Sequence, residues 1–195
     1  MRKLSKPLTD HDRAKITRYS QSAFSQQAWF DAANRLEQAM TLLEPGVRHY
    51  WNCLRDNLND PNGQNVPEYG LENVHLMLAG LVIENLCKGH LVAELRPHER
   101  SRDWEKLKGG RLPESLKSHA VLALVKETGM KVSDPESYLL KRIEAIIDWR
   151  GRYPIPTSHQ KQNPFMNMGS DIDRSKEIVR KLRVQVGAKT TYRVV

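Results

Sequence analysis

The feature that most constrains this chain is a run of largely apolar sequence between Leu71 and Leu95. Its apolar residues follow a helical period but leave no wide polar face. A helix that is apolar on nearly all sides must be covered by other elements. We therefore expect this segment to be the central, most buried helix. Its apolar positions include Val74, Met77, Leu78, Leu81, Val82, Leu86, Leu91, Val92 and Leu95.

Several shorter segments show the same helical spacing and favour an all-α antiparallel bundle, with four core helices and flanking helices. A convincing strand pattern is missing, apart from a weak one at 190–195. At 195 residues the chain is long enough to bury one core. We expect a basic, irregular N-terminal arm at 1–20, the helical bundle at 21–169, and a basic C-terminal helix and tail at 170–195 packed on the bundle. Helices are predicted over 26–43, 47–58, 119–128, 133–152 and 171–186, with Glu44-Pro45-Gly46 ending the first, Ser118 capping the third and Gly129 following the third as its C′ residue. In the last of them, Arg174, Lys181 and Arg183 lie opposite the apolar face.

The helix predicted from residue 133 has the clearest boundaries. Ser133 or Asp134 is its N-cap, Pro135 lies in its first turn, and Glu136 completes a capping box. Its buried stripe consists of Leu139, Ile143, Ile146 and Ile147. Gly151, Pro154 and Pro156 then oppose a helical backbone, so the helix is expected to end near Arg152.

The net charge of +8 is concentrated at the two ends of the chain. Residues 1–20 hold six Lys/Arg against two Asp, and residues 170–195 hold seven against three acidic residues. Basic ends attract polyanions without sequence specificity, which favours nucleic acid as a partner, although solubility alone also explains them. No apolar run approaches a membrane span and the start has no apolar leader, so we expect a cytoplasmic protein without a membrane partner.

Metal and cofactor chemistry find little support in the sequence. Cys53 and Cys87 stand in apolar helical contexts without a paired spacing, which favours buried thiols. Cys87 and His90 are at most a two-ligand fragment, and the other histidines, His119 among them, are scattered. A Gly-rich phosphate loop is also missing. We therefore expect neither a metal nor a cofactor.

The most informative stretch for function is Trp149 to His159, which contains Arg152 and His159 with six residues between them. A permanent cation and a titratable imidazole can act together on one phosphodiester. An all-helical chain with this Arg-x6-His spacing, and with the phrase Trp149-Arg150-Gly151-Arg152-Tyr153-Pro154, resembles a bacterial branch of the HEPN superfamily. The resemblance covers roughly residues 73–159.

This resemblance implies a metal-independent endoribonuclease of a toxin-antitoxin or defence system that acts as a homodimer with paired motifs near a shared cleft. His159 would be the base, Arg152 would stabilise the phosphate, and the products would carry 2′,3′-cyclic phosphate ends. RNA would be the substrate, and an antitoxin or a nucleotidyltransferase-like protein would be the partner. Glu84 and Lys88 resemble an acidic and basic pair of such bundles; they and Arg150 and Tyr153 are candidate cleft residues. As a bare i, i+4 pair, Glu84 and Lys88 would only support their helix by a few tenths of a kcal/mol.

A different class of function is also consistent with the sequence. Tyr153 stands where nuclease members often carry a polar residue, and two prolines prevent Arg152 and His159 from sharing one helical face. The chain would then be a non-catalytic HEPN module that binds RNA, a nucleotide or a partner protein. In that case the WRGRYP phrase would serve as a helix stop, with its arginines complementing the helix dipole. In the expected homodimer, Trp149 and Tyr153 would supply aromatic anchors at the interface, although Trp149 suits a gap in the core equally well.

Overall fold

The structure is a computed structural model that describes residues 9–59, 71–95, 114–150 and 167–188. All regular elements in these ranges are helices, so the predicted all-α bundle is confirmed. The weak strand pattern at 190–195 lies outside the described residues. The elements are α1 (Asp10–Ala23), α2 (Gln26–Asn59), α3 (Leu71–Glu94), α5 (Glu114–Lys117), α6 (Val121–Glu127), α7 (Asp134–Ala145), the π-helix η1 (Ile146–Arg150) and α8 (Asp171–Val186).

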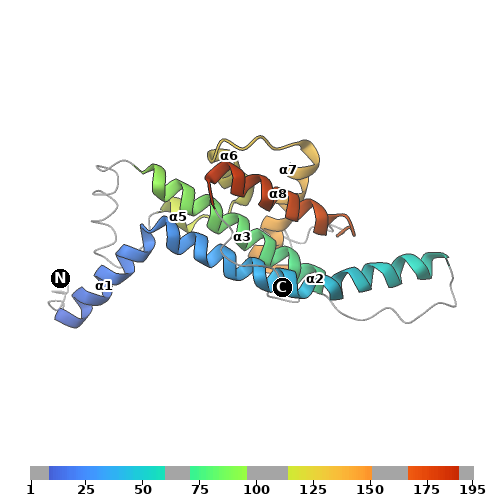
Figure 1. Ribbon diagram of the computed structural model, residues 1–195, viewed down its shortest axis with the longest axis horizontal. Helices are drawn as coiled ribbons and strands as arrows, with labels where there is room; N and C mark the ends of the chain where they lie inside the picture. The colour runs from blue at the N-terminus through green and yellow to red at the C-terminus, as the bar shows by residue number, and fades with distance from the viewer. Residues whose placement is uncertain (1–8, 60–70, 96–113, 151–166, 189–195) are drawn as a thin grey trace, which may run out of the picture.

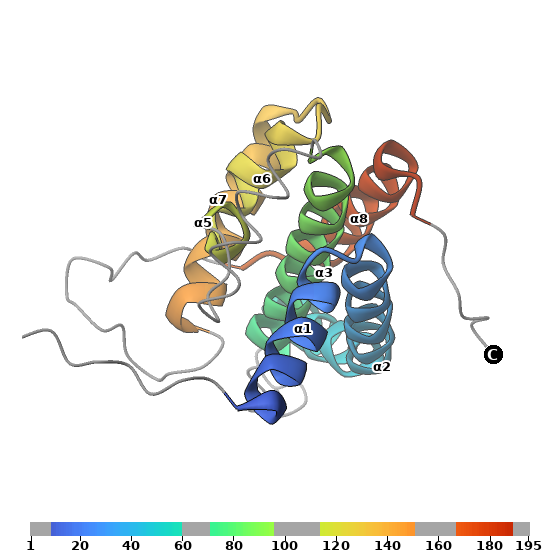
Figure 2. The ribbon, with the colours of Figure 1, turned by 90° about the vertical axis from the view of Figure 1, so that its left-hand side faces the viewer.

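Helix α3 is the central element, as its apolar sequence predicts. It contacts α2, α6, α7, η1 and α8. Figure 2 shows it between α5, α6 and α7 on one side and α2 and α8 on the other. The prediction that no apolar run approaches a membrane span is wrong for α3, which by length and composition alone is the one helix of the described ranges that could cross a membrane. Most of that helix is buried inside the bundle, which is the ordinary situation of a core helix.

Two glycines of the α2–α3 pair mark a close antiparallel approach. A Cβ atom on Gly89 would lie 2.6 Å from a ring carbon of Phe30, and one on Gly46 would lie 3.1 Å from Leu71 Cδ1. The start of α2 therefore lies beside the end of α3, and the middle of α2 beside the start of α3. Figure 1 shows α2 continuing past the bundle beyond this contact.

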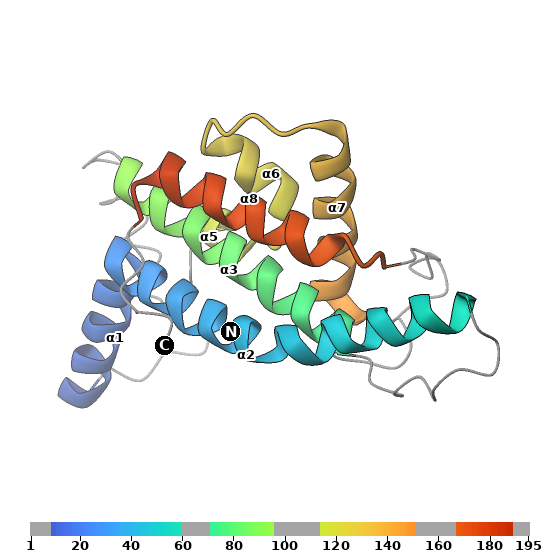
Figure 3. The same cartoon turned by 45° about the vertical axis from the view of Figure 1, so that its right-hand side comes forward.

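The predicted break at Glu44-Pro45-Gly46 is wrong, because α2 is continuous through Pro45. Proline removes one backbone hydrogen bond, here to the Thr41 carbonyl, and costs about 3 kcal/mol inside a helix. Pro45 is exposed, whereas Met40 and Val47 on either side of it are buried. The ribbon of α2 changes direction near its middle in Figure 3. Packing on both sides of Pro45 thus keeps one bent helix where local sequence predicts two.

The prediction of an irregular segment up to residue 20 is also wrong for its described part, which forms α1. Thr9 is the N-cap, and its hydroxyl accepts from the Asp12 backbone N–H at 3.2 Å. The Asp12 carboxylate in turn accepts from the Thr9 backbone N–H at 3.1 Å. This reciprocal capping box has Asp where Glu or Gln is usual, and the segment's low apolar content concealed it.

Helix α7 begins as predicted, with Ser133 as its N-cap and Glu136 accepting from the Ser133 backbone N–H at 2.8 Å. The stripe of Leu139, Ile143, Ile146 and Ile147 is buried, at 1% exposure or less. The last described turn differs from the prediction, because Ile146–Arg150 is a π-helix, η1. The predicted end near Arg152 lies outside the described residues. Such wider turns occur mostly as single turns and are frequent at functional sites.

The prediction that Ser118 caps the helix expected over 119–128 is wrong. Helix α6 has Ala120 as its N-cap, which makes no side-chain hydrogen bond. Instead the Glu144 carboxylate of α7 accepts from the Leu122 backbone N–H at 2.8 Å. Since Leu122 is the second residue of α6, Glu144 does from another helix what an N-cap side chain does locally. Gly129 follows this helix with φ +79°, as predicted for a left-handed C′ residue.

Helix α8 has its predicted bounds and packs on the bundle, with Ile172, Ile178, Val179, Leu182 and Val186 buried. Arg183 was expected on its solvent face, but it is 8% exposed. Its guanidinium donates to Glu37 and to Asn34 of α2, the latter at 2.8 Å. Lys176 pairs with Glu44 at 2.9 Å, so α8 runs antiparallel to α2.

Candidate functional site

The structure separates the predicted site residues into two groups. Arg152, Tyr153 and His159 lie outside the described residues, as does the side chain of Arg150, whose backbone ends η1. Glu84 and Lys88 are described, and both lie on α3. The description of the site therefore starts from this pair.

Glu84 and Lys88 form a buried ion pair rather than the solvated helix pair that surface magnitudes describe. Lys88 Nζ lies 2.6 Å from Glu84 Oε1. Glu84 is 5% exposed and Lys88 is 2% exposed. Burying two charges is strongly unfavourable unless they pair well and their remaining hydrogen-bonding capacity is satisfied. The Lys88 ammonium also lies 5.7 Å from the Trp29 ring centroid, within cation–π range.

The second carboxylate oxygen of Glu84 contacts a histidine that sequence reasoning did not select. His119 Nδ1 lies 2.8 Å from Glu84 Oε2, and the imidazole side chain is 57% exposed. An ionised carboxylate only accepts hydrogen bonds, so this contact assigns a proton to Nδ1. The other ring nitrogen, Nε2, is then available to accept or deliver a proton. We call Glu84, Lys88 and His119 the α3 charge cluster.

Three contacts determine where the α3 charge cluster lies in the bundle. A Cβ atom on Gly80, one turn before Glu84, would lie 2.3 Å from Ile143 Cγ2 and 2.6 Å from Ile147 Cδ1. Helix α7 and η1 therefore pack on α3 beside the cluster. The bond from Leu122 to Glu144 joins the start of α6 to the end of α7 and so fixes the segment that carries His119. His119 is 35 residues from Glu84 in sequence, so no local pattern could have paired them.

The cluster does not extend to the neighbouring thiol. Cys87 is fully buried, and both burial and the Glu84 charge raise its pKa well above the ordinary thiol range. A thiol held neutral is neither a nucleophile nor a metal ligand. Cys53 is likewise buried and free, so both cysteines match the prediction of buried thiols. Within the described ranges, His, Cys, Asp and Glu side chains nowhere gather in the threes that would hold a metal ion.

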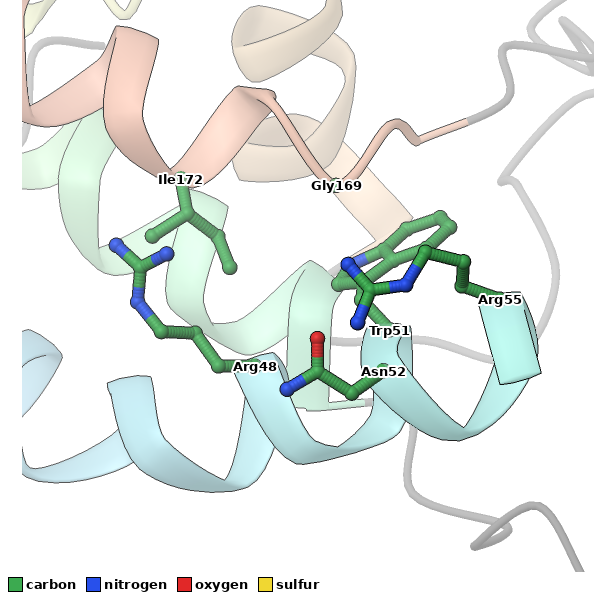
Figure 4. A pocket seen from close by; sticks show the side chains of 6 residues that line it. All are labelled: Arg48, Trp51, Asn52, Arg55, Gly169 and Ile172. Atoms are coloured by element: carbon green, nitrogen blue, oxygen red, sulfur yellow. The ribbon is translucent and has the colours of Figure 1, made fainter.

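A second feature is a pocket between the later part of α2 and the start of α8. It has a volume of about 380 Å³ and is lined by Arg48, Trp51, Asn52, Arg55, Gly169 and Ile172. Figure 4 shows the two guanidinium groups, the carboxamide and the indole around it. A Cβ atom on Gly169 would lie 3.5 Å from the Trp51 ring, so the turn before α8 packs on the indole.

Acidic residues offset most of the positive charge on this side of the molecule. Arg48 binds Glu44 at 2.8 Å and Asp173 at 2.5 Å. Burial opposes ionisation of Glu44, but hydrogen bonds from Lys176 and Arg48 outweigh it and lower the pKa of that carboxyl. Along α8, Lys181 pairs with Glu136 and Arg180 with Glu177. The described cations of α8 therefore already have acidic partners, which compete with a polyanion for them.

Comparisons with protein-family models, with curated proteins and with solved structures found no match to this chain.

Proposed function

We propose that this protein is a metal-independent endoribonuclease of the HEPN type. Arg152 stabilises the charge on the scissile phosphate, and His159 takes the proton from the ribose 2′-OH, which attacks that phosphate. The products carry a 2′,3′-cyclic phosphate and a 5′-hydroxyl. The proposal includes a cytoplasmic setting, which is the expectation from the sequence. It also includes a toxin-antitoxin or defence role and an antitoxin or nucleotidyltransferase-like partner, both of which come from the HEPN resemblance.

The observation that carries this proposal is the packing of α7 and η1 on α3 beside a buried charge pair. Ile147 of η1 contacts Gly80, one turn from Glu84, and Arg152 follows Ile147 by five residues. Because Lys88 and His119 both bind Glu84, this part of α3 carries titratable groups in addition to the Arg-x6-His motif. That combination supports phosphodiester chemistry.

A homodimer completes this proposal. One Arg and one His make a sparse site for a polyanion, and a two-fold axis would double both without any new residue.

The experiment is incubation of the purified protein with total RNA in EDTA, followed by analysis of the fragment ends. We expect cleavage that leaves cyclic phosphate and 5′-hydroxyl ends. Arg152→Ala and His159→Ala should each lower the rate by about a hundred- to thousandfold, since each removes one group that acts in the transition state. The matched controls Arg180→Ala and His11→Ala alter an exposed arginine and an exposed histidine, and should cleave at the wild-type rate.

Cleavage that survives His159→Ala, after contaminating nuclease is excluded, would contradict the assignment of the base. RNA that stays intact with the wild-type protein would instead favour the second candidate, a non-catalytic HEPN module. The pocket beside Trp51 favours that candidate specifically, because an indole with guanidinium and carboxamide groups suits a nucleobase and its phosphate. Trp51→Ala would then weaken nucleotide or RNA binding measured by fluorescence titration.

A further inference from the structure

We propose that His119 is the general acid that protonates the leaving 5′-oxygen of RNA, with Glu84 and Lys88 as its positioning residues. This inference rests on the proposed function, which supplies a base for the 2′-OH but no donor for the leaving group. An alkoxide leaves with difficulty unless it receives a proton as its bond to phosphorus breaks. A positioned acid contributes to such a step by proton transfer in the transition state.

The geometry of the α3 charge cluster suits an acid because it holds one imidazole nitrogen and presents the other. Glu84 Oε2 receives the Nδ1 proton at 2.8 Å, while more than half of the imidazole is exposed, at 57%. The carboxylate is 5% exposed, so it remains in place and its charge is weakly screened by solvent. When both ring nitrogens are protonated, Glu84 balances the imidazolium and Nε2–H remains free to donate.

Lys88 holds the Glu84 carboxylate in its orientation. Its ammonium binds Oε1 at 2.6 Å, which leaves Oε2 for His119. The charged or titratable groups that we assign around His119 are therefore Glu84 and Lys88 of α3, with the Trp29 ring of α2 against the ammonium. Lys88 and Glu84 are buried, whereas His119 is exposed. The proton donor is therefore the member of the cluster that a substrate can reach.

The step balances as an ordinary transesterification. The 2′-oxygen forms a bond to phosphorus while the bond from phosphorus to the 5′-oxygen breaks. The 2′-OH proton passes to the base of the proposed function, and the Nε2 proton of His119 passes to the 5′-oxygen. His119 ends neutral and regains its proton from solvent, so no oxidant, reductant or metal takes part.

The test compares two substrates that differ only in the leaving group: a ribodinucleotide, and a ribonucleoside 3′-(4-nitrophenyl phosphate) whose leaving group needs no proton. His119→Asn keeps a side-chain donor for Glu84 and removes the Nε2 proton. We expect this variant to cleave the dinucleotide about a hundred- to ten-thousandfold more slowly, and to cleave the nitrophenyl ester at nearly the wild-type rate. It should also lose the fall in dinucleotide cleavage at alkaline pH, because that fall reports deprotonation of the acid.

Other outcomes separate the two proposals. Equal losses on both substrates would overturn the acid role, as would an unchanged rate on the dinucleotide; His159→Ala should lose both substrates whichever holds. A wild-type protein that cleaves neither substrate would overturn the proposed function and the acid role with it. A readout independent of activity is the long-range ¹H–¹⁵N spectrum of His119: a neutral ring protonated at Nε2 instead of Nδ1 would contradict the assigned contact with Glu84. His11→Ala is the control for the loss of an exposed histidine.

Discussion

Two buried carboxylate–cation pairs of this protein differ in the partner that the second carboxylate oxygen binds. Arg142 of α7 binds Asp171 of α8 at 2.5 Å, with side chains 1% and 2% exposed. The second oxygen of Asp171 accepts from the Met168 backbone N–H at 2.7 Å, so this carboxylate binds a backbone group as well as Arg142. The Glu84–Lys88 pair is almost as short, at 2.6 Å, but the second oxygen of Glu84 binds His119, whose side chain is 57% exposed. We call Arg142–Asp171 the closed pair, because both carboxylate oxygens bind groups within the fold. We call Glu84–Lys88 the open pair, because Glu84 also contacts the exposed ring of His119.

This difference separates a structural ion pair from a candidate catalytic one. A buried pair adds little net stability against an apolar replacement, but loss of one partner leaves an uncompensated charge. A single substitution in either pair should therefore destabilise the fold. Of the two, the Glu84–Lys88 pair binds the exposed imidazole of His119, which can exchange protons with a substrate.

Loss of the closed pair should have the largest effect on stability. Asp171→Ala leaves the Arg142 guanidinium buried without this carboxylate, and we expect unfolding to become easier by about 3–5 kcal/mol. Urea denaturation followed by circular dichroism measures it. Asp173→Ala is the matched control, because Asp173 lies two residues away on α8 with 67% side-chain exposure. If the two variants unfold alike, the closed pair does not hold α7 to α8.

The open pair should respond less, because Glu84 also contacts His119, whose side chain is exposed to solvent. Glu84→Gln removes the charge but keeps an oxygen that can accept from one of the two donors. We expect a loss of about 1.5–3 kcal/mol, the range for hydrogen bonds to charged groups. The same denaturation assay measures it, with exposed Glu94→Gln as the control on the same helix. A loss as large as that of Asp171→Ala would show that His119 does not relieve the buried charge.

His75 is a third buried titratable group, and it differs from the two pairs because its imidazole makes no hydrogen bond within the described residues. It is fully buried on α3. Burial lowers the pKa of its imidazole; Glu44 opposes that shift, and the charges of Lys176 and Arg48 add to it. At a pH between this lowered pKa and about 6.5, the His75 imidazole is therefore protonated in the unfolded chain but neutral in the folded chain.

Stability should then fall as the pH drops from 7.5 toward 5, by up to about 1.4 kcal/mol per pH unit from this residue. His75→Leu should flatten that slope when unfolding is measured by urea titration at several pH values. The carboxylates with lowered pKa, Glu44 and Glu136 among them, lose their contribution only at more acidic pH. An equal slope in the variant and the wild type would show that His75 is not the source.

Sequence reasoning was most successful where local chemistry and burial agree. The capping box at Ser133 and the stripe ending at Ile147 defined α7, and the left-handed glycine after α6 was also anticipated. Reasoning was least successful where a distant contact decides. Pro45 predicts a helix end, but packing of α2 along α3 on both sides of it outweighs one lost hydrogen bond. The Arg152 and His159 assignments remain predictions, since both residues lie outside the described part of the chain.

The sequence by itself determined α3, α7 and α8, because apolar periodicity and capping residues act within a few turns of the chain. It therefore specified that α3 is central and that α8 packs with one face. Only the tertiary structure decided that Glu84 and Lys88 are buried and that His119 completes them, since a spacing of 35 residues carries no local signal. The same holds for Glu144, which caps α6 from another helix. Helical pattern fixes which face of a helix is buried, and the packing of that face decides which distant side chain meets a charge there.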